Sequence, residues 1–188
     1  MTVATFLMDL TEVTVSAYAS CVSATQCATP ATGSGYNWGV TGKENHPING
    51  VSWTDANTYC TWAGKRLPTE EEWEYAARYD DGRDYPWGST APSATLANYG
   101  TSGTTAVGSY PNGASKLGIQ DQAGNVWEWT STLYYGTTPC TGTSGNSRVL
   151  RGGSWNYSDA STLRAAYRDV FSPSNRYDNN GFRCARTL

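Results

Sequence analysis

The chain has 188 residues, enough for one domain with its own hydrophobic core. Its 13 lysines and arginines face 16 aspartates and glutamates, and no basic run occurs, which argues against nucleic-acid binding. No apolar stretch approaches the ~18 residues of a membrane span. Residues 1–10 lack the positive flank and long apolar run of a signal peptide. We expect a single domain over residues 1–188 without a nucleic-acid partner or a membrane span.

The first half of the chain predicts one short strand and three helices. Residues 6–10 are typical of a strand, and 14–24 predict a short helix. A capping box starts a helix over 52–62, which a glycine ends. A second box, with Thr69 as N-cap, starts a helix over 69–78. The glutamates that follow Thr69 are expected to mark this helix start and a solvated face.

The second half of the chain predicts turns and short strands. Residues 80–125 contain strong helix breakers, such as Asp-Asp-Gly and Pro-Asn-Gly, and a strand series begins at 126–129. Few helices, many short strands and long loops together predict an α+β fold.

Cysteine usage favours an oxidising compartment. No pair has Cys-x-x-Cys spacing and the chain has one histidine, His46, so a zinc site is not expected. Disulfides in an extracytoplasmic or surface-displayed protein fit better, with one cysteine left over. Cys21 pairs with Cys27, or one of these two pairs with Cys140.

The C-terminal region, 148–188, combines a regular frame with an irregular filling. Apolar strand-like segments at 148–155 and 180–186 enclose a stretch of aromatic, hydroxyl, Asp and Asn residues that follows no helical or strand period. Such a loop surface on a scaffold has the composition of a binding paratope.

Motifs along nearly the whole chain resemble the formylglycine-generating-enzyme (sulfatase-modifying-factor) family, which has a C-type-lectin-like fold. They include Gly-Asn-Val-Trp-Glu-Trp at 124–129, Arg-Gly-Gly-Ser at 151–154 and Gly-Phe-Arg-Cys-Ala at 181–185. The segments 46–53, 59–75 and 85–88 add to this match in the family's order.

The resemblance does not extend to the family's oxidase chemistry. Those enzymes carry two closely spaced cysteines after the Gly-Gly-Ser turn, which bind copper and attack the substrate thiol. A thiolate is needed for both roles, and residues 155–183 contain no cysteine. Tyr157 and Ala160 lie near the positions concerned. We therefore expect neither copper nor a catalytic residue. One histidine also cannot supply the iron site of the ergothioneine-pathway relatives.

The resemblance implies two structural features. The family links the cysteines of its Tyr-Cys-x-Trp-Ala and Gly-Phe-Arg-Cys motifs, which here are Cys60 and Cys184; the alternative is two buried thiols. A structural Ca²⁺ site would be formed by Asp121, Gly124, Val126 and Glu128, since hard oxygen ligands on a tight turn suit this ion. Alternatively, Asp121 caps a turn and Glu128 forms an internal ion pair.

The C-terminal region is also similar to that of the variable proteins of diversity-generating retroelements. Those proteins carry scattered diversified positions between an Arg-Gly-Gly-Ser-Trp segment and a Gly-Phe-Arg segment. The resemblance implies a ligand-binding site on one exposed face, with Tyr167 as the aromatic most suited to the core instead. The expected site residues are Tyr157, Asp159, Asp169, Val170, Phe171, Ser172, Ser174, Tyr177 and Asp178.

The function predicted from the sequence is non-enzymatic binding of a protein or other macromolecular ligand. One alternative is an enzyme or pseudoenzyme of the sulfatase-modifying-factor family acting on a peptide or small molecule. A second is an accessory domain of a larger surface protein without a diversified site.

Overall fold

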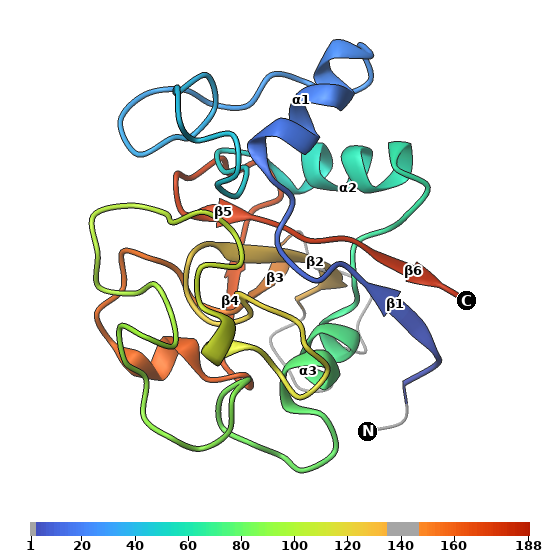
Figure 1. The fold of residues 1–188 in the computed structure, drawn as a ribbon. Coiled ribbons are helices and arrows are strands. Elements are labelled where there is room, and N and C mark those ends of the chain that lie inside the picture. The colour runs from blue at the N-terminus through green and yellow to red at the C-terminus, as the bar shows by residue number, and fades with distance from the viewer. Residues whose placement is uncertain (1–2, 135–146) are drawn as a thin grey trace.

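The computed structural model describes residues 3–134 and 147–188 and has an α+β fold (Figure 1). Three helices and short strands are connected by long loops. The elements in chain order are β1 (Phe6–Met8), α1 (Val15–Ser23), α2 (Trp53–Trp62), α3 (Glu70–Arg78), η1 (Pro111–Gly113), β2 (Trp127–Leu133), β3 (Arg148–Arg151), η2 (Ala160–Leu163), β4 (Arg168–Phe171), β5 (Asn180–Gly181) and β6 (Ala185–Thr187).

Local sequence signals set the helix starts. Both predicted capping boxes are present: the hydroxyl of Ser52 accepts from the N–H of Asp55 at α2, and that of Thr69 accepts from Glu72 at α3. Each box satisfies backbone donors that would otherwise lack a partner in the first turn. The opening strand is shorter than predicted, because only residues 6–8 pair with β6.

Two sheets organise the fold. β1 and β6 form an antiparallel pair that brings the first and last strands side by side (Figure 1). The second sheet has the order β4-β3-β2-β5, in which β5 runs parallel to β2 and the other pairs are antiparallel. β4 is therefore an edge strand in the described part of the chain.

Two disulfides tie distant or irregular segments together. Cys60 of α2 is bonded to Cys184, next to β6, as predicted, and Cys21 of α1 is bonded to Cys27. All four cysteines belong to the main hydrophobic core. Cys140 lies outside the described residues. Two disulfides suggest an oxidising, extracytoplasmic environment, and none of the described helices is long and apolar enough to cross a membrane.

Candidate functional site

The strand register of the four-stranded sheet divides the C-terminal region between two faces. Side chains alternate along a strand, so Asp169 and Phe171 of β4 share one face, and Leu150 of β3 lies opposite Asp169. Trp127 of β2 is paired with Asn180 of β5 on that same face. We call this the front face. The back face carries the residues that alternate with these in each strand, such as Arg168 and Val170 of β4.

Aromatic rings gather on the front face around the buried indole of Trp127. The Tyr157 ring lies 5.9 Å from it at 84°, and the Tyr167 ring 6.0 Å from it at 36°. Phe171 and Tyr177 form a second edge-to-face pair at 5.3 Å. Tyr167 is 39% exposed and Tyr177 is 46% exposed, whereas Trp127 is fully buried. Rigid aromatic side chains presented in this way provide contact area at low entropic cost.

The floor beneath these rings contains unsatisfied polar groups. Trp127 and Asn180 are both fully buried. Neither polar atom of the Asn180 carboxamide has a hydrogen-bond partner within residues 3–134 and 147–188, whereas the indole N–H of Trp127 lies near the Tyr157 hydroxyl, a contact that partly offsets the rise that burial causes in the pKa of that phenol. A buried polar group without a partner costs free energy. A ligand or water that reached these groups would recover it.

Asp169 shares the front face with the aromatic rings, and its charge acts on Tyr157. Burial, and then the charge of Asp169, raise the pKa of Tyr157 above its usual 10.0. The Oδ1 atom of Asp169 accepts from the N–H of Val170 at 2.8 Å. The arginines of the same region form ion pairs elsewhere: Arg164 with Asp84, Arg168 with Glu70 and Arg176 with Asp55.

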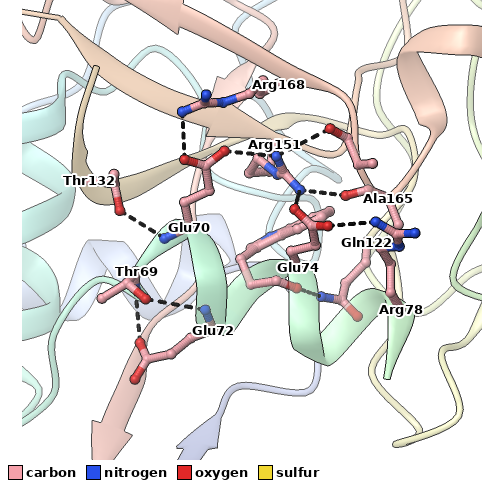
Figure 2. Close-up of polar contacts among 12 residues, drawn as sticks. Thr69, Glu70, Glu72, Glu74, Arg78, Gln122, Thr132, Arg151, Ala165 and Arg168 are labelled. Atoms are coloured by element: carbon pink, nitrogen blue, oxygen red, sulfur yellow. Dashed lines mark hydrogen bonds and ion pairs between the residues drawn. The ribbon is translucent and has the colours of Figure 1, made fainter. Parts of the chain in front are cut away.

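An ion-pair network holds the back face of the sheet against α3. Figure 2 shows Glu70, at the start of α3, between Arg151 of β3 and Arg168 of β4, at 2.9 and 2.7 Å. Arg151 also bonds Glu74 at 2.8 Å. The expected solvated face is wrong for part of this helix, because Glu70 and Glu72 are buried. β3 brings in the fully buried Arg151, which requires carboxylate partners. The back is thereby anchored to α3, while Tyr167 and Tyr177 at the front remain exposed.

The structure places the nine expected site residues in several positions. Tyr157, Asp169, Phe171 and Tyr177 lie on or beside the front face. Ser172 and Ser174 form the exposed turn after β4, with their hydroxyl oxygens 3.0 Å apart. The remaining three point elsewhere: Asp159 caps η2, Val170 lies on the back face opposite Val149, and Asp178 packs beside Gly35.

The sequence interpretation missed three residues at the front face: Tyr167, which is exposed, and Trp127 and Asn180, which are fully buried beneath it. Tyr167 was the aromatic expected in the core. The spacing of Tyr167, Asp169 and Phe171 by two is a signal that could have placed them together. For Trp127 and Asn180 no local signal exists, since only the parallel pairing of β2 with β5 makes them neighbours.

The expected calcium residues form part of a buried charge cluster. Both oxygens of Glu128 accept from Arg183, each at 2.7 Å, and Trp73 donates to the same carboxylate. This is the internal ion pair considered as the alternative. Glu12 and Asp121 lie close by and are also buried. Burial first, then the charges of Asp121 and Glu128, raise the pKa of Glu12 well above its usual 4.5.

The frame after β3 depends on two glycines. Gly152 and Gly153 have φ values of +98° and +76°, and a Cβ on Gly153 would lie 2.8 Å from Leu163. Only glycine adopts this conformation without strain. Ser154 follows, fully buried, so the turn fixes where Tyr157 emerges at the front face.

This fold, a small sheet and three helices carrying a loop-borne aromatic surface, is that of C-type-lectin-like proteins of the formylglycine-generating-enzyme type. The family model for the sulfatase-modifying factor enzyme 1-like domain matches residues 1–188, and the chain belongs to this family.

Relatives with different catalytic status share the family. Formylglycine-generating enzyme of Streptomyces coelicolor is 42% identical over 173 residues, covering 78% of this chain and 54% of that protein. Inactive C-alpha-formylglycine-generating enzyme 2 of Bos taurus is 40% identical over 164 residues, covering 78% and 52%. The chain thus spans about half the length of these curated relatives. The Treponema denticola variable protein 1 structure has a TM-score of 0.77 at 24% identity, covers 97% of this chain and 84% of its own, and shares the fold.

Proposed function

We propose that this chain is a non-enzymatic binding protein that holds a protein or other macromolecular ligand at the front face. The observation that carries the proposal is the division of the sheet. Arg151 and Arg168 anchor its back to α3, while Tyr157 and Asp169 are partly exposed at the front and Tyr167 is exposed there. Substitutions at the front therefore leave the anchored scaffold intact, which suits a diversified binding surface like that of retroelement variable proteins.

The distribution of cysteines supports a binding role over thiol oxidation. The family's oxidase chemistry requires a free thiol pair beside the substrate. Residues 155–183 contain no cysteine, and the four described cysteines are all consumed in disulfides within the core. The side chain that emerges from the Gly-Gly-Ser turn toward the front is the phenol of Tyr157.

A display selection with a matched variant tests the proposal. A random peptide library would be selected on the parent protein. The clones would then be compared on a front-face variant in which the two exposed tyrosines, Tyr167 and Tyr177, are both serine. We expect clones that bind the parent and lose binding to the variant. Thermal melts of the two proteins should nearly coincide, because exposed substitutions change stability little.

Two results would contradict the proposal. Clones that bind parent and variant equally would move the ligand site away from the front face. Conversion of a cysteine in a sulfatase-type peptide to formylglycine by the purified protein would favour the enzymatic alternative.

A structural calcium ion is a second element of the proposal. Asp121 and Glu128 would supply carboxylate oxygens, and Gly124 and Val126 their carbonyls, with Glu128 shared with Arg183. Within the described residues no three acidic, histidine or cysteine side chains converge as a metal site, so this proposal rests on two buried carboxylates, Asp121 and Glu128, and two main-chain carbonyls. Hard oxygen donors suit Ca²⁺. An ion that binds only the folded state raises the stability of the protein. Removing calcium with a chelator should therefore lower the melting temperature. An unchanged melt, with no calcium found by elemental analysis, would refute the site.

A further inference from the structure

Asp169 gives the front face a negative charge that forms no ion pair with a described side chain, and its observed partner is the N–H of Val170. Arg148 of β3, which lies opposite Phe171 on the same face, packs over the Trp53 ring and donates to the Ser131 carbonyl. Arg168, its neighbour in β4, points to the back face and bonds Glu70. The nearby arginines are thus already engaged, and a partner must supply any cation for this carboxylate.

The rings around Asp169 are also open to a cation. Elsewhere in the described chain, lysine or arginine lies over the rings of Trp53, Trp73, Tyr79 and Tyr134, at 3.9 to 5.4 Å. No such contact involves Tyr157 or Tyr167 within the described residues. Aromatic faces attract ammonium and guanidinium groups, more strongly where water is excluded.

The floor of the site favours a polar occupant over an apolar one. Asn180 has an unpaired carbonyl oxygen and an unpaired amide N–H₂, both of them buried. A basic side chain carried on a peptide supplies donors for the Asn180 carbonyl oxygen, and the peptide's backbone carbonyls supply acceptors for the Asn180 amide. An aliphatic side chain would leave these groups unsatisfied.

We propose that the front face recognises a lysine or arginine side chain of a partner protein, held against Tyr157 and Tyr167 with its charge at Asp169. This assignment of partner chemistry rests on the proposed binding function. The partner is then a protein with an exposed basic segment. The charge-assisted hydrogen bond to Asp169 selects the residue type, and the tyrosine rings hold its aliphatic stem.

The test uses small probes and nuclear magnetic resonance on the whole chain. The probes are N-acetyl-lysine methylamide and N-acetyl-arginine methylamide, with the norleucine analogue as the uncharged control. We expect saturable shifts of the Trp127 indole N–H and the Tyr167 amide with the two cationic probes. The norleucine probe should bind at least about tenfold more weakly, and added salt should weaken the cationic probes.

A pair of variants with the same change of net charge completes the test. Asp169→Asn should weaken the cationic probes about tenfold. Asp80→Asn, at a side chain that is 70% exposed near Lys116, should leave their binding unchanged. Equal binding of norleucine, or parent-like binding by Asp169→Asn, would overturn the cation assignment. If the display clones lose binding to the front-face variant while these probes fail, the binding function stands and only the assignment of partner chemistry falls. Failure of both refutes the proposed function itself.

Discussion

The two disulfides should stabilise the protein to very different extents. They close loops of different length: Cys60 and Cys184 have a sequence separation of 124, and Cys21 and Cys27 have one of 6. In the chain-entropy account, a cross-link stabilises mainly by removing conformations from the unfolded chain. The relation between loop length and entropy gives about 5 kcal/mol for the long loop and about 2 kcal/mol for the short one at 25 °C.

Two double variants would measure this difference. Replacing Cys60 and Cys184 with alanine should lower the free energy of unfolding by about 3 kcal/mol more than replacing Cys21 and Cys27. Both pairs lie in the same core, so the loss of sulfur packing is similar in the two variants. Urea denaturation followed by tryptophan fluorescence provides the measurement. Equal losses, or a larger loss for the short loop, would show that native packing rather than loop entropy dominates.

Two further predictions concern the buried charges. The pKa of Glu12 is raised in the folded protein, so above about pH 4.5 the folded state keeps a proton that the unfolded chain releases. The contribution of Glu12 to stability is therefore lost as the pH rises through its folded pKa. In the presence of a chelator, the melting temperature of Glu12→Gln should therefore exceed that of the parent at pH 8 but not at pH 4. The same difference in melting temperature at both pH values would contradict the raised pKa. Glu128→Gln should cost about 3–5 kcal/mol because it leaves Arg183 buried without its partner. Asp9→Asn, at the partly exposed Lys65 pair, should cost less than about 1 kcal/mol. If urea denaturation gave similar losses of stability for Glu128→Gln and Asp9→Asn, burial of the Glu128–Arg183 pair would not increase the cost of breaking it.

Local sequence information determined much of the scaffold. The capping boxes at Ser52 and Thr69 predicted the starts of α2 and α3, because their hydrogen bonds join residues three apart. Family motifs predicted the bond between Cys60 and Cys184, although no local rule joins residues this distant. They also predicted the Gly-Gly-Ser frame, where backbone conformation restricts the residue type.

The tertiary structure alone decided which side chains form the candidate site. Val170 was expected at the surface beside Asp169, yet the two lie on opposite faces because the pairing of β4 with β3 sets the phase of the alternation. Glu70 was expected in solvent and is buried, because β3 brings Arg151 to it from 81 residues away. Trp127 and Asn180 meet only through the parallel pairing of β2 with β5. Composition predicts that a segment is suited to binding, but which side chains face a ligand depends on strand register, which long-range packing fixes.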